Sequence, residues 1–215
     1  PIMKLNVSVS GQTPVFWREA LAELSDDLNR TLCEGGTEIR CTRGEGIAVV
    51  CDGVSVDLTW SSDVEFFRAM SLIPVPLAPC DIREKANFKS SGPMFDCSRN
   101  GVVNPDAMRF FIRKMALMGL NLGMLYTEDT YEVPGRPFFG YKRGRYTYEE
   151  LKAIDDYAYA LGIEVVPAVQ ALAHQSTVMV WDAYLPIREN NRTLLPGEPK
   201  TYEFLRHVLA AATRP

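Results

Sequence analysis

The sequence predicts an α/β protein in two parts, and three observations lead to that prediction. Short strand-like runs separated by glycine turns fill most of the first 73 residues. The proline-rich run PVPLAP, residues 74–79, then interrupts the periodicity. From Lys89 onward the pattern changes to strand, helix, strand, helix, strand, which is typical of parallel strands joined by crossover helices.

The first part, residues 1–85, is predicted to be a small α+β domain. Gly44–Gly46 and Asp52–Gly53 are expected to form hairpin turns, and Ser62 followed by Glu65 is a capping box that starts a helix. Helical spacing predicts one long helix at Val15–Leu32. Alternating hydrophobicity predicts four strands, at Lys4–Val9, Thr37–Arg43, Gly46–Cys51 and Val54–Thr59.

The second part, residues 86–215, contains three predicted β/α units. Asn104 with Pro105 caps the first helix, and Thr147 with Glu150 caps the second. The predicted strands are Gly92–Cys97, Asn121–Thr127 and Ile163–Val169, and the third helix is Thr201–Thr213. Because a closed β/α barrel needs eight strands, this part is predicted to be an incomplete TIM-type barrel, the N-terminal part of a longer catalytic domain.

Composition and charge limit the classes of ligand and partner that the protein is expected to bind. The net charge is −4, from 23 basic and 27 acidic residues, without a basic patch, which argues against nucleic acid and anionic membranes as partners. A neutral or weakly polar ligand fits better. No apolar run is long enough for a membrane helix, and residues 1–10 lack the features of a signal peptide, so a cytoplasmic location is expected unless a leader has been removed.

The five cysteines, at positions 33, 41, 51, 80 and 97, form an odd set without C-x-x-C spacing. This pattern indicates neither a disulfide framework nor a structural zinc site. We expect buried free thiols.

Polar side chains follow each of the three predicted barrel strands. Arg99 follows the first strand, Glu128 and Asp129 end the second, and His174 follows the third. Functional groups of β/α barrels lie at the carboxyl ends of the strands. These residues are therefore the candidate site: Arg99 as a guanidinium that binds two ligand oxygens, and His174 as a partner for one of the two acids in a hydrogen-bond relay.

Structural roles are the alternative for each candidate. Arg99 can instead pair with Asp96, and a lone histidine such as His174 is usually a satisfied core or surface residue. Glu128 and Asp129 are adjacent, so on a strand they point to opposite sides and only one can face the barrel mouth.

The loop Tyr131–Thr147 is much longer than the usual β/α connection of about 2–6 residues. Its aromatic residues can stack against sugar rings, or the loop can pack on itself. These residues are Tyr131, Phe138, Phe139, Tyr141 and Tyr146.

Five sequence segments resemble the family 20 glycoside hydrolases, the β-N-acetylhexosaminidases, and in particular their bacterial branch. The segments cover about residues 88–205: GPMFDCSRN, MGLNLGMLYTEDTYEVPG, FGYKRGRYTYEEL, GIEVVPAVQALAH and LLPGEPKTYEFL. The N-terminal part resembles the non-catalytic α/β domain of that family. VQALAH departs from the Pro-Gly that precedes the histidine in many relatives.

The resemblance implies a role for each candidate. The arginine matching Arg99 binds hydroxyls of the terminal N-acetylhexosamine, and an acid matching Glu128 or Asp129 pairs with His174 and leads toward the catalytic glutamate. The family mechanism is retaining and substrate-assisted, because the 2-acetamido oxygen attacks the anomeric carbon while a glutamate protonates the leaving oxygen. It implies no cofactor and no metal.

The catalytic Asp-Glu pair of the family follows the fourth strand, so the resemblance places no catalytic residue in this chain and the pair after residue 215. We expect the chain alone to be inactive and its parent to be an exo-β-N-acetylhexosaminidase acting on N-acetylhexosamine glycans. The alternative is a non-catalytic carbohydrate-binding or interaction module of the same family. The open barrel edge also predicts self-association.

Overall fold

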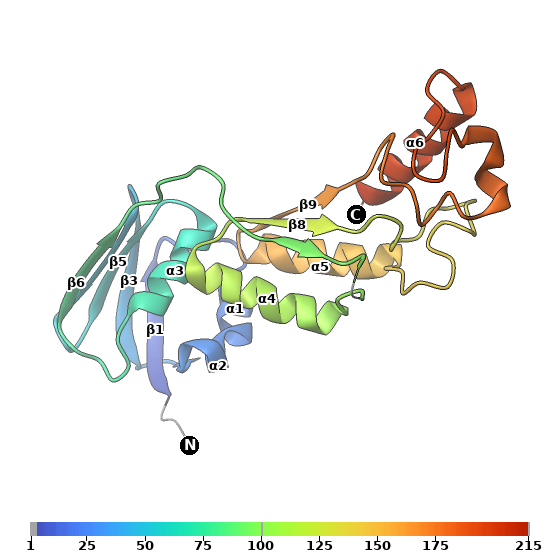
Figure 1. Cartoon of the computed structure of the whole chain (residues 1–215). Coiled ribbons are helices and arrows are strands. Elements are labelled where there is room, and N and C mark those ends of the chain that lie inside the picture. The colour runs from blue at the N-terminus through green and yellow to red at the C-terminus, as the bar shows by residue number, and fades with distance from the viewer. Residues whose placement is uncertain (1–3, 100, 215) are drawn as a thin grey trace. The chain divides into compact units, whose positions relative to one another are not determined.

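The computed structural model describes residues 4–99 and 101–214, which form two compact units (Figure 1). Unit one comprises the chain up to Gly92 together with Arg109–Leu122 and Tyr157–Glu164. Unit two comprises Pro93–Met108, Gly123–Asp156 and the chain from Val165 onward. Asn100, which belongs to one of the motifs quoted above, lies outside the described residues.

Unit one is built on a six-stranded mixed sheet. The strand order is β2-β1-β3-β5-β4-β6, with β1 parallel to β2 and β3, β3 parallel to β5, and β4 antiparallel to β5 and β6. The strands are β1 (Leu5–Gly11), β2 (Arg30–Leu32), β3 (Thr37–Arg43), β4 (Ile47–Cys51), β5 (Val56–Trp60) and β6 (Cys80–Glu84).

Helix α3 (Asp63–Leu72) packs on β4 and β5 and buries Phe66, Phe67 and Met70 completely. The predicted capping box of Ser62 and Glu65 is confirmed, since both of its reciprocal hydrogen bonds are present. Two further short helices, α1 (Trp17–Glu23) and α2 (Ser25–Leu28), precede β2.

Two sequence predictions for this unit are wrong. The helical spacing of Val15–Leu32 does not give one helix, because Asn29 adopts a left-handed conformation with φ of 53° and the chain then pairs with β1 as β2. Gly44–Gly46 is not a hairpin turn, because β5 lies between β3 and β4. The edge strand β6, formed by Cys80–Glu84 after PVPLAP, was not predicted.

The hairpin at Asp52–Gly53 is confirmed and joins β4 to β5. The Asp52 carboxylate accepts hydrogen bonds from the backbone N–H groups of Val54 and Ser55, both at 2.7 Å. Gly53 supplies the positive φ, 93°, that this tight turn requires.

The later segments of unit one are held by ion pairs and by a side-chain hydrogen bond to the backbone. Helix α4 (Pro105–Met118) carries Arg113 and Lys114, and both pair with Asp27 of α2 at 2.9 and 2.7 Å. Arg68 of α3 donates to the carbonyl of Leu117. These contacts fix the C-terminal part of α4 to the N-terminal helices.

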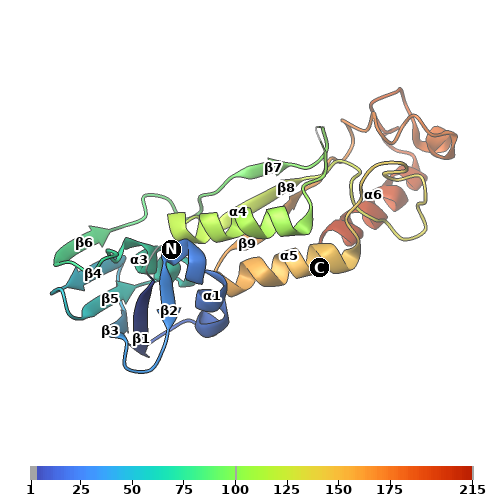
Figure 2. The ribbon, with the colours of Figure 1, turned by 90° about the horizontal axis from the view of Figure 1, so that it is seen from below.

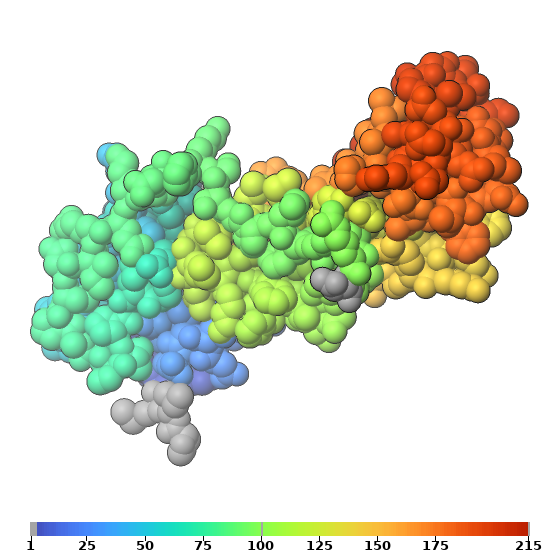
Figure 3. Space-filling model, viewed as in Figure 1, coloured from blue at the N-terminus to red at the C-terminus, as the bar shows by residue number. Residues whose placement is uncertain are grey.

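Unit two contains a three-stranded sheet in the order β7-β8-β9, formed by Met94–Asp96, Leu122–Tyr126 and Glu164–Ala168. The strands match the three predicted barrel strands in position but are shorter. The N-terminal part of helix α5 (Tyr148–Ala160) lies beside this sheet (Figure 2). The chain after β9 forms the short helix η1 (Asp182–Ile187) and α6 (Pro199–Ala212), which gather with their connecting loops in the space-filling view (Figure 3).

Two predicted helix starts in this region are confirmed. Asn104 accepts a hydrogen bond from the backbone N–H of Ala107 at 2.8 Å, and α4 begins at Pro105. Thr147 and Glu150 make both hydrogen bonds of a capping box. None of the described helices has the length and hydrophobicity that crossing a bilayer requires.

Candidate functional site

Two of the predicted site segments leave the sheet of unit two at the carboxyl ends of neighbouring strands. β7 and β8 are parallel, with Asp96 opposite Tyr126. Arg99 and Glu128, which follow these strand ends, therefore emerge side by side.

Arg99 is presented by a turn that Asp96 organises. The Asp96 carboxylate accepts hydrogen bonds from the backbone N–H groups of Ser98 and Arg99, at 3.0 and 3.3 Å, and also lies 3.5 Å from the Arg99 guanidinium. The Arg99 side chain nevertheless remains 62% exposed. Asp96 thus holds the guanidinium through Nε, and much of the group stays exposed to a ligand.

Tyr126 connects Arg99 to Glu128. Arg99 donates to the Tyr126 hydroxyl at 3.2 Å and lies over its ring, and the same hydroxyl donates to Glu128 Oε1 at 3.1 Å. The bond to Tyr126, with the charges of Asp96 and Glu128, raises the pKa of Arg99 above its usual value. The three side chains form a continuous polar rim.

Glu128 has a φ of 48°, a conformation that non-glycine residues adopt at a cost of about 1–3 kcal/mol. The following turn is held by Thr130, whose hydroxyl donates to the carbonyls of Thr127 and Cys97 at 2.8 and 3.1 Å. These bonds keep Glu128 beside Tyr126.

Asp129 points into the protein instead. Only 1% of it is exposed, and its Oδ1 atom lies 3.2 Å from Arg143 Nε without a hydrogen-bond partner among the described residues. Burial raises the pKa of Asp129, against the opposing effect of the Arg143 charge. As the sequence analysis expected, the two adjacent acids occupy different environments.

His174 is exposed, has a φ of 61°, and makes no hydrogen bond or ion pair within the part of the chain that the structure describes. The relay between His174 and one of the acids therefore stays a prediction. The segment just after it does reach Asp129: the Thr177 hydroxyl contributes to lowering the pKa of that carboxyl, although its geometry falls short of a hydrogen bond.

The long loop between β8 and α5 packs on itself and against α6. Tyr131, Phe139 and Tyr146 are each 1% exposed, and Tyr131 and Tyr146 form a β-bridge. For these three residues the self-packed alternative holds. Gly140 allows the loop to approach Asp129, because a side chain there would meet the Asp129 carbonyl at 2.1 Å.

Phe138 and Tyr141 differ from the rest of the loop, being 39% and 43% exposed. Together with Trp181 they form a cluster, which we call the aromatic cluster: Phe138 stacks on Trp181 at 5.7 Å between ring centroids, and Tyr141 meets Trp181 edge-on at 5.1 Å. The aromatic cluster joins the loops that follow β8 and β9.

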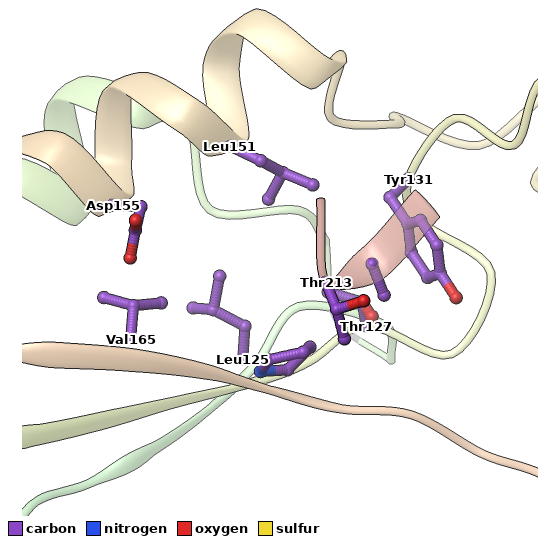
Figure 4. A pocket seen from close by; sticks show the side chains of 9 residues that line it. Leu125, Thr127, Tyr131, Leu151, Asp155, Val165 and Thr213 are labelled. Atoms are coloured by element: carbon purple, nitrogen blue, oxygen red, sulfur yellow. The ribbon is translucent and has the colours of Figure 1, made fainter. Parts of the chain in front are cut away.

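A cavity of about 160 Å³ lies between the sheet and the helices of unit two (Figure 4). Leu125 and Val165 of the strands and Leu151 and Asp155 of α5 line it, with Thr213 at the end of α6. Because successive residues of a strand point to opposite faces, the Leu125 side faces away from Tyr126 and Arg99. The cavity is mainly apolar and separate from the rim.

Sequence reasoning missed two residues of this region, Tyr126 and Arg143. The strand period places Tyr126 on the face opposite Leu125, so its position beside Arg99 could have been inferred. Arg143 is one of several cations in the loop, and no sequence signal distinguishes it.

Within residues 4–99 and 101–214, no group of three or more His, Cys, Asp or Glu residues is arranged to hold a metal ion.

Comparison with known proteins gives similarity at the level of structure. No family model matches the sequence, and no curated protein matches it. The exo-β-N-acetylglucosaminidase of family GH20 from Vibrio harveyi, solved with N-acetylglucosamine, superimposes with a TM-score of 0.80 at 17% identity, over 96% of this chain and 41% of that one. The chain has the fold of these GH20 enzymes.

Two further GH20 structures agree. Flavobacterium johnsoniae chitobiase matches with a TM-score of 0.76 at 20% identity, over 100% of this chain and 40% of that one. Streptomyces plicatus N-acetyl-β-hexosaminidase, in complex with thio-NAglucal, matches with a TM-score of 0.77 at 19% identity, over 98% and 53%. The chain thus spans about half, or less, of the length of the GH20 structures that it matches.

Proposed function

We propose that this chain is part of an exo-acting β-N-acetylhexosaminidase that removes terminal N-acetylglucosamine or N-acetylgalactosamine from glycans. The observation that carries the proposal is the fold similarity, with TM-scores of 0.74–0.81 over 96–100% of the chain. All of these structures are named as hexosaminidases, glucosaminidases or chitobiase.

The proposal includes an incomplete TIM-type barrel whose catalytic Asp-Glu pair lies outside these 215 residues. Coverage of only 40–54% of the matched structures supports this. The three strands β7, β8 and β9 would be the first three of the eight in the complete barrel.

In this mechanism the substrate supplies its own nucleophile, the 2-acetamido oxygen, and the protein supplies binding and proton transfer. Arg99 would donate to two hydroxyls of the terminal sugar. Its exposed guanidinium at the strand edge, anchored through Asp96 and Tyr126, supports that role, because an anchored fork loses little freedom on binding.

Of the two adjacent acids, we propose Asp129 as the partner of His174. Glu128 already accepts a hydrogen bond from Tyr126, whereas buried Asp129 Oδ1 has an ion-pair contact with Arg143 but no hydrogen-bond donor among the described residues. A buried carboxylate oxygen without a donor is costly, and an imidazole N–H would supply one. The nearness of Thr177 to Asp129 supports an approach of the His174 segment.

The first experiment measures turnover of a chromogenic N-acetylglucosaminide by this chain and by the full-length parent. We expect turnover by the parent alone. Replacing Arg99 with Ala in the parent should lower kcat/KM about 10- to 100-fold, the loss expected for a charged hydrogen bond to substrate. The matched control is Arg83→Ala, an exposed arginine on β6 outside the rim, which should leave kcat/KM unchanged. An inactive parent would refute the proposal.

The second experiment separates the two acids. In the parent, Asp129→Asn should shift the pH profile of kcat, because it removes the charge that we pair with His174. Glu128→Gln should change mainly KM, since Glu128 lies beside the sugar-binding Arg99. The opposite pattern would reassign the relay to Glu128.

The aromatic cluster favours a second candidate function, a carbohydrate-binding module without catalysis. Phe138 and Tyr141 are partly exposed, and exposed rings stack on the apolar faces of sugars. Calorimetric titration of the chain with chitooligosaccharides tests it. Binding by the chain that Phe138→Ala abolishes, together with an inactive parent, would favour the module over the enzyme.

A further inference from the structure

Two of the five free cysteines lie directly opposite each other on neighbouring strands. Cys51 is the last residue of β4 and Cys80 is the first residue of β6, and they are partners in the register of this antiparallel pair. The other two cysteines of unit one are not placed for such pairing. β5 separates Cys41 on β3 from β4, and Cys33 follows β2 at the opposite edge of the sheet.

Directly opposed residues of an antiparallel pair project from the same face of the sheet. The burial pattern agrees: Ile47, Val49 and Cys51 are the buried residues of β4, and on β6 Cys80, Ile82 and Glu84 are more buried than the two residues between them. The Cys80 thiol also turns toward β4, because it donates to the carbonyl of Val49 at 4.0 Å. Both sulfur atoms thus occupy one face.

Opposed residues of antiparallel strands have Cα atoms about 4.5 or 5.5 Å apart, depending on the hydrogen-bonding pattern at that pair. A disulfide needs Cα atoms about 4.4–6.8 Å apart. The strand register therefore satisfies the Cα condition. The Cβ atoms of directly opposed residues lie about 4.5–5.5 Å apart, at or just above the 3.5–4.5 Å of a disulfide, so closure needs a rotation of both side chains and a small approach of the two strands.

The two thiols differ in accessibility. Cys51 is 4% exposed, and its sulfur accepts a hydrogen bond from the backbone N–H of Gly53 at 3.3 Å. Cys80 is half-buried on the edge strand β6, between the exposed residues Pro79 and Asp81. A reagent in solution would meet Cys80 first, with Cys51 as the resolving thiol behind it.

We propose that Cys51 and Cys80 are a site of oxidative modification, at which a low-molecular-weight disulfide such as oxidised glutathione converts the two thiols into a cross-strand disulfide. The Cys80 thiolate attacks one sulfur of the reagent, forming a mixed disulfide and releasing one glutathione thiolate. The Cys51 thiolate then attacks the Cys80 sulfur and releases the second glutathione. Two protein thiols are oxidised, one reagent disulfide is reduced, and both protons leave to solvent.

The disulfide would lock the edge of the sheet. It would close the chain segment that contains the Asp52–Gly53 turn, β5 and α3, and it would fix β6 to β4. Burial, with the nearby Cys51 and Asp81, raises the pKa of the Cys80 thiol. Because the thiolate is the reactive form, we expect the disulfide to form slowly and to stabilise the sheet, not to act as a rapid redox sensor.

The test treats the reduced chain with millimolar oxidised glutathione under native conditions, blocks the remaining thiols, and maps the linked peptides by mass spectrometry. We expect a peptide that joins Cys51 to Cys80, the loss of two hydrogen atoms in the intact mass, and a fall in free thiols from five to three. Retention of all five thiols, a persistent glutathione adduct, or a link between other cysteines would each overturn the proposal.

Two variants complete the test, each checked for native folding by circular dichroism. Cys80→Ser should abolish the link, whereas Cys33→Ser, at another half-buried cysteine, should keep it. Oxidation should raise the melting temperature of the unmodified sequence by about 5–10 °C and leave that of Cys80→Ser unchanged. An equal shift in both proteins would contradict the locking of β6.

Discussion

Asp27 is the residue on which the contact between α2 and α4 depends most. Its side chain is 14% exposed and accepts hydrogen bonds from Arg113 and Lys114. Burial raises the pKa of Asp27, but the hydrogen bonds from Lys114 and Arg113 outweigh burial and leave the pKa below its usual value. A carboxyl with a lowered pKa in the folded state stabilises the fold above the unfolded-state pKa, and this contribution is lost as the pH falls through the folded-state value.

We therefore predict that Asp27→Asn lowers the free energy of unfolding at pH 7 by about 1–2 kcal/mol. The difference from the unmodified chain should shrink as the pH falls below the usual value of 3.8. Urea denaturation at several pH values measures both effects. Asp26→Asn is the control, because Asp26 is 93% exposed and its pair with Lys4 should contribute little. Equal losses in the two variants would refute the assignment.

Gly92 is required by a close approach of backbone to backbone. A Cβ atom at this position would lie 1.5 Å from the Leu122 carbonyl oxygen. We predict that Gly92→Ala lowers the free energy of unfolding by about 3 kcal/mol, because neither backbone segment can move without breaking its hydrogen bonds. Gly35→Ala should cost about 1 kcal/mol, since its φ of +74° is unfavourable for alanine but nothing lies within 4 Å. Thermal denaturation compares the two, and similar losses would contradict the steric explanation.

At the scale of the element, α5 depends on its N-terminal cap. The Glu150 N–H donates to the Thr147 hydroxyl at 3.1 Å, and the Thr147 N–H donates to the Glu150 carboxylate at 2.9 Å. We predict that Thr147→Ala destabilises the chain by about 1 kcal/mol and that Thr147→Ser retains most of the stability. Chemical denaturation of both variants measures this, and equal losses would show that the methyl group of Thr147 matters more than its hydroxyl.

The elements that the sequence predicted correctly are those specified by neighbouring residues. The caps at Ser62, Asn104 and Thr147 need only a side chain and a backbone group three residues away, so their signal is local. β2 and β6 were missed because RTL is only three residues long and the alternation in CDIRE is short and directly follows a proline-rich run, so pairing with β1 and β4 defines these strands. Tertiary pairing outweighed the local signal in both cases.

The candidate site follows the same division. Strand ends can be recognised in the sequence, so Arg99 and Glu128 could be placed together at the carboxyl ends of two parallel strands. The sequence predicted that Glu128 and Asp129 point to different sides but not which of them is buried, because the backbone conformation at Glu128 and the contact of Asp129 with Arg143 arise from the folded loop. For the same reason the position of His174 relative to the acids was beyond prediction.

At the scale of the whole molecule, the self-association that the sequence predicts would involve one of the two edge strands of the three-stranded sheet. β9 contains Pro167, which lacks an N–H group and makes that edge a poor partner for strand pairing. β7 pairs with β8 on one side only, and its first residue, Met94, is 57% exposed. The β7 edge is thus the better candidate for the self-association that the sequence predicted.

We predict that the chain associates with increasing concentration and that Met94→Lys shifts it toward the monomer, because a charge on an edge strand opposes pairing with a second copy. Analytical ultracentrifugation over a range of concentrations measures the effect. Val54→Lys is the matched control, since Val54 is 77% exposed at the hairpin turn of unit one and is not part of this sheet. A chain that stays monomeric throughout, or a Met94→Lys variant that associates as strongly as the Val54→Lys variant, would show that the β7 edge does not mediate association.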